Sequence, residues 1–253
     1  MLYIYTVLIL LVFEMTIIRT PSNTPQPSAD KGYNHSVTIE KLLHSNPKLW
    51  RGCDMAGQGF RGQSTGFPQL DDILPSRGWP QSGLIEVITP CWGIGELQLL
   101  IPLMRSVVEQ GKWVLWITPP HMPYAPALVQ VGVNTDQILV VKRDTSCKDA
   151  LWSMEKALQT SNFGLVLTWQ NWLPGKVLRR LQLAAENGNT LGVFFKHHDS
   201  KYSPSTIRLK IKDSLVRSHN KEVSDFSETE ITVINARGNF RSLTTRVNLY
   251  QPS

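Results

Sequence analysis

The sequence has few cysteines and no apolar run long enough to cross a membrane. Its three cysteines, Cys53, Cys91 and Cys147, are odd in number, and their spacings match neither a zinc site nor a disulfide framework. The apolar stretch at residues 1–13 is shorter than the about 20 residues that a membrane-spanning helix needs. These absences argue against a disulfide-stabilised secreted domain and a membrane protein, and they predict a cytoplasmic location and no metal site.

The apolar stretch also lacks the features of a secretory signal. No basic residues precede it, no clear small-residue cleavage site follows it, and Met15 then opens a polar segment. We therefore expect translation to start at Met15 and residues 1–14 to be a wrongly assigned extension, with a weak membrane anchor as the alternative. A native peptide that contains residues 3–13 would contradict this hypothesis.

Short apolar runs alternate with segments of helical periodicity. Strands are expected at residues 84–88, 113–117, 138–141, 165–167 and 191–195. Helices are expected at residues 67–74, 96–110, 127–131, 149–160 and 176–187, with a kink at Pro102 and a helix end at Gly188. This alternation predicts an α/β fold with a mostly parallel sheet and helices on both faces.

Composition divides the chain into three parts. Residues 1–63, with segments rich in Pro, Ser, Asn and Gly, are expected to form a flexible arm. Residues 64–212 are expected to form the α/β core, which ends with a strand at 207–211. Residues 213–253 are expected to form a polar loop, a terminal strand at 231–235 and a weakly specified tail.

The loop after strand 84–88 stands where a phosphate-binding loop would stand but lacks its functional residues. The motif G-x-x-x-x-G-K-[ST] needs two glycines, a lysine for the β/γ-phosphates and a hydroxyl for magnesium. These four positions hold Thr89, Ile94, Gly95 and Glu96. A carboxylate at Glu96 would repel a γ-phosphate, by about 1 kcal/mol in water at ~4 Å and by several times that in a drier site.

The other requirements of ATP chemistry are also missing. The strand at 165–167 continues into Thr168, Trp169 and Gln170, so no acid is placed to order a metal. Gly93 and Gly95 are then explained as residues that let a strand turn tightly into a helix, and a first-turn carboxylate suits the helix dipole. We expect no catalytic residue, no bound nucleotide, no cofactor and no metal. An ATPase is the competing hypothesis, which a magnesium-ATP titration would decide.

Aromatic and basic residues supply the candidates for partner contacts. Trp50 and Arg51 lie in the glycine-rich arm, and Trp and Arg are favoured at the centres of protein interfaces. Lys176, Arg179 and Arg180 lie within one helical turn and predict a basic face, for which a merely solvated surface is the alternative.

Several long, non-repetitive segments resemble the ImuA family of translesion-synthesis accessory proteins. They are residues 64–71, 78–80, 83–87, 93–97, 113–126, 150–152 and 178–186. The same core resembles the SulA family of cell-division inhibitors, a degenerate relative of RecA, which implies a RecA-like fold. The resemblance covers residues 49–195, with weaker similarity at 209–238.

We favour the ImuA type, because SulA-type chains are shorter and lack much of residues 49–52, the 64–80 segment and the C-terminal strands. This resemblance implies a bacterial, non-catalytic SOS-response protein that contacts an ImuB-like polymerase relative, RecA and an error-prone polymerase. The SulA resemblance implies a division inhibitor that binds FtsZ after DNA damage. A weak or indirect contact with DNA is the remaining alternative, since residues 196–253 carry ten Lys and Arg against six Asp and Glu.

Overall fold

The computed structural model describes residues 62–170, 173–200, 203–212, 228–236 and 242–249, together with Lys41 and Ser45. The chain divides into two compact units, Met1–Trp50 and Arg51–Ser253, and the elements described below belong to the second unit. The expectations about residues 1–14 and about almost all of the arm 1–63 fall outside the described residues.

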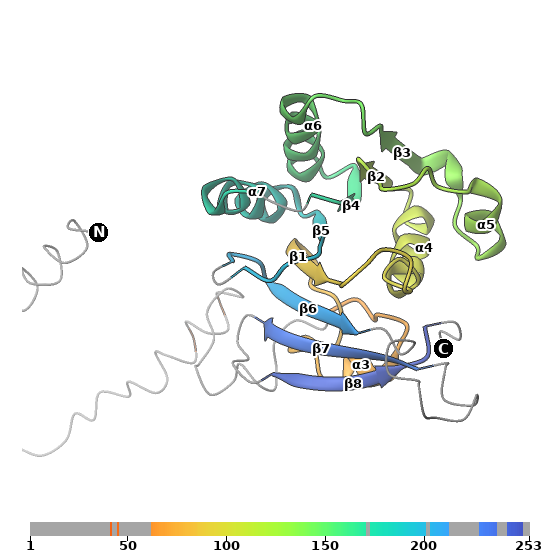
Figure 1. Cartoon of the computed structure of the whole chain (residues 1–253). Helices are drawn as coiled ribbons and strands as arrows, with labels where there is room; N and C mark the ends of the chain where they lie inside the picture. The colour runs from red at the N-terminus through yellow and green to blue at the C-terminus, as the bar shows by residue number, and fades with distance from the viewer. Residues whose placement is uncertain are drawn as a thin grey trace, which may run out of the picture. The chain divides into compact units, whose positions relative to one another are not determined.

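An eight-stranded sheet in the order β3-β2-β4-β5-β1-β6-β7-β8 forms the centre of this unit. The strands are β1 (Gly83–Ile88), β2 (Trp113–Ile117), β3 (Ile138–Val141), β4 (Phe163–Thr168), β5 (Leu191–Lys196), β6 (Ile207–Lys212), β7 (Thr229–Ala236) and β8 (Leu243–Val247). Neighbours from β3 to β6 pair in parallel, whereas β7 is antiparallel to both β6 and β8 (Figure 1).

The sheet is therefore mixed, which corrects the expectation of a mostly parallel sheet. Parallel neighbours need a long crossover connection, usually a helix. The sequence that joins β6 to β7 has no helical apolar period, and these two strands pair antiparallel. The strand β8 lies in residues 237–253, for which the sequence predicts only a weakly specified tail.

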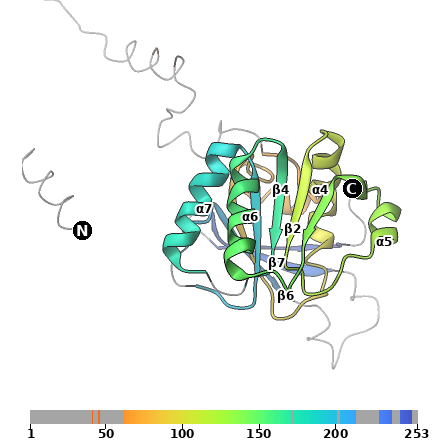
Figure 2. The same cartoon turned by 90° about the horizontal axis from the view of Figure 1, so that it is seen from above.

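Helices cover both faces of the sheet, as the alternation predicts. They are α3 (Pro68–Asp71), α4 (Ile101–Glu109), α5 (Ala125–Gln130), α6 (Cys147–Gln159) and α7 (Gly175–Gly188), with short 3-10 turns η2 (Gln98–Leu100) and η3 (Thr135–Gln137). The apolar residues of α3, α4 and α5 pack in one core, and those of α6 and α7 pack in a second core on the other face. Figure 2 shows α6 and α7 side by side, away from α4 and α5.

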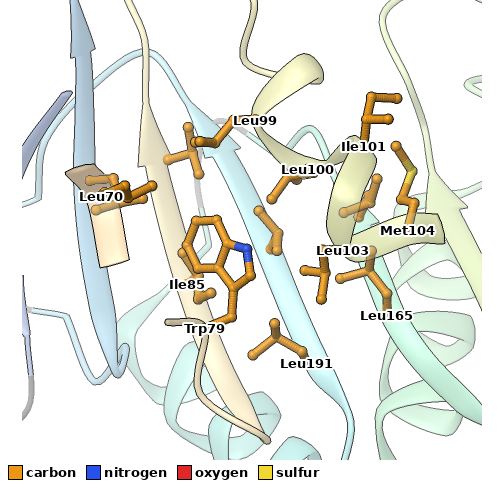
Figure 3. Close-up of a cluster of buried hydrophobic side chains, with 14 of the residues drawn as sticks. Leu70, Trp79, Ile85, Leu99, Leu100, Ile101, Leu103, Met104, Leu165 and Leu191 are labelled. Atoms are coloured by element: carbon orange, nitrogen blue, oxygen red, sulfur yellow. The ribbon is translucent and has the colours of Figure 1, made fainter. Parts of the chain in front are cut away.

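The larger core is organised around Trp79, which is fully buried. Figure 3 places its indole between Leu70 of α3, Ile85 of β1 and the leucines that lead into α4. An isolated antiparallel bridge to Gln63 holds the backbone of Trp79 in place. The segment 62–82 is thus part of the packed core, because burying a side chain of this size contributes several kcal/mol.

Two helix boundaries differ from the expectation. Pro102 lies in the first turn of α4 and does not kink a longer helix, because its missing N–H and restricted φ suit a helix start. Asn189, with φ +51°, ends α7 in place of Gly188. Gly188 serves a close approach instead, since a Cβ there would lie 2.1 Å from the carbonyl oxygen of Leu158 in α6.

Candidate functional site

The loop between β1 and α4 keeps an anion-binding turn and fills it with its own carboxylate. Gly93 and Gly95 have φ values of +87° and +102°. The Gly93 N–H donates to Oε1 and Oε2 of Glu96 at 2.8 and 3.0 Å, and the Ile94 N–H donates to Oε2 at 3.0 Å. Successive backbone N–H groups aimed at one anion form a nest of the kind that binds phosphate. Glu96, with 5% of its surface exposed, takes up these donors.

This geometry refines the sequence-based interpretation of Glu96. Its carboxylate does not sit in the first turn of α4, which begins at Ile101 after the η2 turn. It folds back onto the loop and replaces an external anion. A phosphate would therefore have to displace a buried carboxylate as well as overcome its repulsion.

His197, which follows β5, packs against the loop. The Thr89 hydroxyl donates to the Cys91 carbonyl at 2.7 Å, and Nδ1 of His197 lies 3.0 Å from the Thr89 carbonyl oxygen. Because a carbonyl only accepts, His197 carries its proton on Nδ1 in this contact. The His197 ring also lies against Trp92, with ring centroids 3.9 Å apart. The predicted loop is thus held closed by its neighbours.

Aromatic rings occupy the position where an ATPase would place an acid after β4. Trp169 stacks on Phe195 of β5, with centroids 4.8 Å apart and an interplanar angle of 21°, and meets Trp116 of β2 at 5.4 Å. All three side chains belong to or pack against the core on the α4 face. Within the described part of the chain, no group of three or more His, Cys, Asp or Glu residues could hold a metal ion.

A buried ion cluster at the centre of the sheet is the feature that the sequence did not predict. Glu86 of β1 is fully buried, and its Oε1 accepts from Nζ of Lys196 at 2.6 Å and from the Ser203 hydroxyl at 2.7 Å. Its Oε2 accepts from Nε of Arg208 at 3.1 Å. The guanidinium of Arg208 also pairs with Asp199. Strands β1, β5 and β6 are thereby joined by charges as well as by their backbone ladders.

The cations decide the protonation state of Glu86. Burial alone raises the pKa of this carboxyl, but the hydrogen bond and the charge of Lys196, with help from Ser203 and Arg208, outweigh burial and lower it. Glu86 is therefore charged at neutral pH. The available sequence signal was one glutamate in an otherwise apolar strand and one lysine that ends another.

The predicted partner residues are only partly visible. Trp50 and Arg51 lie outside the described residues. The other three candidates, Lys176, Arg179 and Arg180, lie on α7 and are exposed. They share the outer face of α7, on the opposite side of the sheet from α4 and its preceding loop.

An exposed apolar surface lies along the connection from β2 to β3 and was also missed. Met122, Tyr124 and Val129 expose 69%, 71% and 59% of their surfaces. We call these three residues the β2–β3 surface. The connection begins at Thr118, a β-branched residue with φ +48°, whose hydroxyl accepts from Nε2 of Gln170 at 3.3 Å. Such a backbone angle is strained for threonine and is typical of functional loops.

Comparison with known proteins gives one family. The sequence pattern of the family described as cell division inhibitor SulA matches residues 93–192. The SulA proteins of Photorhabdus laumondii and Edwardsiella piscicida are 32% and 33% identical to the chain over 49% and 48% of its length. These matches cover 68% and 73% of the two relatives.

A solved structure shares the fold. It is an ATPase domain that superposes with a TM-score of 0.54 at 10% sequence identity, over 87% of this chain and 96% of that domain. At this identity the likeness concerns the fold alone. In the part of the chain that the structure describes, no helix has the length and apolar character needed to cross a bilayer.

These matches correct the main functional prediction. The curated relatives are cell division inhibitors, so the assignment to ImuA-type translesion synthesis was wrong and the SulA alternative is the better one. The prediction that the chain is not an enzyme is confirmed, because these relatives are inhibitors. The chain belongs to the SulA family of cell division inhibitors.

Proposed function

We propose that this chain is a cytoplasmic, SOS-induced division inhibitor that binds FtsZ and prevents its assembly after DNA damage. The observation that carries the proposal is that the family match spans residues 93–192, which include the whole β2–β3 surface. A division inhibitor without enzymatic activity must act by binding. The chain offers an exposed apolar surface within the part that it shares with other inhibitors.

The β2–β3 surface has the properties of a protein-binding surface. Scattered exposed apolar residues are normal, but three large ones within residues 122–129 are typical of an interaction site. Tyr124 supplies an aromatic ring with a polar tip, a residue type favoured where binding energy concentrates. The hydrogen bond from Nε2 of Gln170 to the Thr118 hydroxyl fixes the first residue of the β2–β3 connection. We therefore place the FtsZ contact at Met122, Tyr124 and Val129.

The closed loop supports action without nucleotide. Glu96 already satisfies the N–H groups of Gly93 and Ile94, so these two donors are not free for a phosphate. We propose that the fold is a RecA-like core with a degenerate phosphate loop, reused for protein binding. We propose an arm at residues 1–63, which includes Trp50 and Arg51, a core at 64–212 and a final segment at 213–253. The strands β7 and β8 of this final segment extend the sheet of the core.

The proposal is tested by expressing the chain in growing bacteria and by adding the purified protein to FtsZ. Wild-type protein is expected to produce filamentous cells and to suppress GTP-dependent assembly measured by light scattering. The double variant Met122→Asp/Tyr124→Asp should bind FtsZ at least about thirtyfold more weakly, since losing one hot spot costs about 2 kcal/mol or more.

Leu243→Asp is the matched control, because Leu243 is an exposed apolar residue on β8, far along the sheet from β3. This variant should inhibit as the wild type does. Normal cell length and undisturbed assembly with wild-type protein would refute the function. Inhibition that survives the double variant would refute the proposed contact surface.

A further inference from the structure

The outer surface of α6 carries an exposed tryptophan between two lysines. Trp152 exposes 60% of its surface, although other apolar residues of α6, such as Met154 and Leu158, are buried. Lys148 and Lys156 lie one helical turn to either side of it and are both exposed. Nothing in the packing of α6 against the sheet requires an indole at this position.

The neighbouring helix α7 adds cations and a second apolar side chain. Lys176 and Arg179 are exposed, and Leu183, one turn beyond Arg179, exposes 44% of its surface. The two helices are tied together by an ion pair, with Nε of Arg180 3.1 Å from Oε1 of Glu155. We define the α6–α7 surface as Lys148, Trp152, Lys156, Lys176, Arg179 and Leu183.

The acidic groups of this surface already have partners. Asp149 accepts from the Ser146 hydroxyl at 2.6 Å at the start of α6, and Glu155 is paired with Arg180. The four cations of the α6–α7 surface make no ion pair with any described residue. Lys148 and Lys156 flank the exposed tryptophan on α6, and Lys176 and Arg179 add positive charge to the outer face of α7.

From this combination we infer that the α6–α7 surface is a second docking site, for an acidic protein segment that carries an apolar side chain. Carboxylates would pair with the free cations, and the apolar side chain would cover Trp152. Duplex DNA would satisfy the cations but leave Trp152 and Leu183 exposed. A second copy of this chain is disfavoured by its net charge of +6.

The inference goes beyond the proposed function, because the two surfaces lie on opposite faces of the sheet. Tyr124 and Val129 lie next to and on α5, whose Leu128 packs in the same core as α4, whereas α6 and α7 pack against the other side. One molecule could therefore hold FtsZ on one face and the acidic segment on the other. Failure of either interaction leaves the other testable by itself.

The test uses the full-length protein and a fluorescently labelled peptide in which two leucines are flanked on each side by glutamates. Binding is followed by anisotropy, with a short duplex DNA as a second probe. We expect saturable peptide binding that weakens with salt, as an exposed charge interaction does. Lys176→Glu/Arg179→Glu and Trp152→Ser should each weaken it by about tenfold or more.

Two controls separate the surface from general charge attraction. Lys210→Glu reverses an exposed charge on β6 and should leave peptide affinity nearly unchanged. In protein labelled with 5-fluorotryptophan, the fluorine resonance that Trp152→Phe removes should shift when the peptide is added. All of these variants should keep a urea unfolding midpoint close to that of the wild type, which shows that they are folded.

Three results would overturn the inference. The first is that the peptide does not bind. The second is that Lys210→Glu weakens peptide binding as much as the variants of the α6–α7 surface do. The third is that the Trp152 resonance does not shift when the peptide is added to saturation. The inference would also be refuted if duplex DNA bound more tightly than the peptide and if the same variants lost this binding. The partner of the α6–α7 surface would then be nucleic acid and not an acidic protein segment.

Discussion

Two buried glutamates, ten positions apart, are stabilised in different ways. Glu86 lies in the middle of the sheet, where Lys196 and Arg208 neutralise it with side-chain charges from β5 and β6. Glu96 lies in the loop that follows β1, where the backbone N–H groups of Gly93 and Ile94 bind its carboxylate. One carboxylate depends on long-range tertiary contacts, and the other on a turn of four residues.

This difference explains which glutamate the sequence could reveal. The loop is local, so its departure from a phosphate-binding motif is visible position by position. The ion cluster joins residues more than a hundred positions apart, and no local pattern connects Glu86 to Lys196 or Arg208. The loop therefore bears on nucleotide binding, whereas the cluster bears on the stability of the sheet.

The largest effect is expected from breaking the cluster. Lys196→Met removes a cation that is 4% exposed and leaves Glu86, which is fully buried, with one cationic partner. Removing one member of a buried ion pair costs about 3–5 kcal/mol, so the urea unfolding midpoint should fall strongly. Lys210→Met, on the exposed side of β6, should change stability by less than about 0.5 kcal/mol. A loss below about 1 kcal/mol for Lys196→Met would show that Arg208 suffices.

A smaller effect is expected from removing the Glu96 carboxylate from the loop. Glu96→Ala leaves the N–H groups of Gly93 and Ile94 without their acceptor, which costs about 1–3 kcal/mol in urea unfolding. Glu96→Gln keeps an acceptor oxygen and should lose less. Amide hydrogen exchange at Gly93 and Ile94 should accelerate most in the alanine variant. Equal stability of the wild type and Glu96→Ala would contradict a structural role for this carboxylate.

The two loop glycines should differ in how much stability the protein loses when each is replaced by alanine. Gly95→Ala should destabilise the protein more than Gly93→Ala, although both positions have positive φ. A Cβ at Gly95 would meet Cδ1 of Leu249 at 2.8 Å, while a Cβ at Gly93 meets nothing within 4 Å. The backbone penalty common to both is about 1–2 kcal/mol, and the difference between their melting temperatures measures the clash. In a Leu249→Ala background, most of this difference in melting temperature should disappear. An unchanged difference would refute the contact between residue 95 and Leu249.

The smallest effect concerns pH. Because the pKa of Glu86 is lower in the folded than in the unfolded protein, its contribution to stability is present above its usual pKa and is lost as the pH falls through the folded value. Wild-type protein should therefore lose more stability than Glu86→Gln when unfolding is compared at neutral pH and in acid. Parallel losses in both proteins would mean that the cations do not hold the carboxylate charged.

The fold could be predicted well where the apolar period is strong. The expected strand 138–141 coincides with β3, and the expected helix 176–187 lies within α7. The strand β8 was not predicted because a short edge strand with polar residues at its three central positions has little apolar pattern. The predicted kink at Pro102 was wrong because the helix was expected to start at residue 96, whereas α4 starts at Ile101. The sequence alone does not show whether a proline lies in the first turn of a helix or in its interior.

The candidate surfaces were predicted less well. Lys176, Arg179 and Arg180 are exposed on one side of α7, as their spacing indicates, and their role in partner binding stays a prediction. Met122 and Tyr124 were not named, since a tyrosine or methionine in a turn is as often buried as exposed. Only the packing of α5 and β3 shows which apolar residues are left outside.

The sequence by itself determined that the loop after β1 lacks, at the motif positions, the glycines, the lysine and the hydroxyl with which an ATPase binds phosphate and magnesium. It also determined the alternation of strands and helices through the apolar period. The tertiary structure decided what replaces the phosphate, how Glu86 is neutralised and which apolar side chains face solvent. These depend on contacts between segments far apart in the chain, where burial and charge pairing, not local pattern, set the free energy.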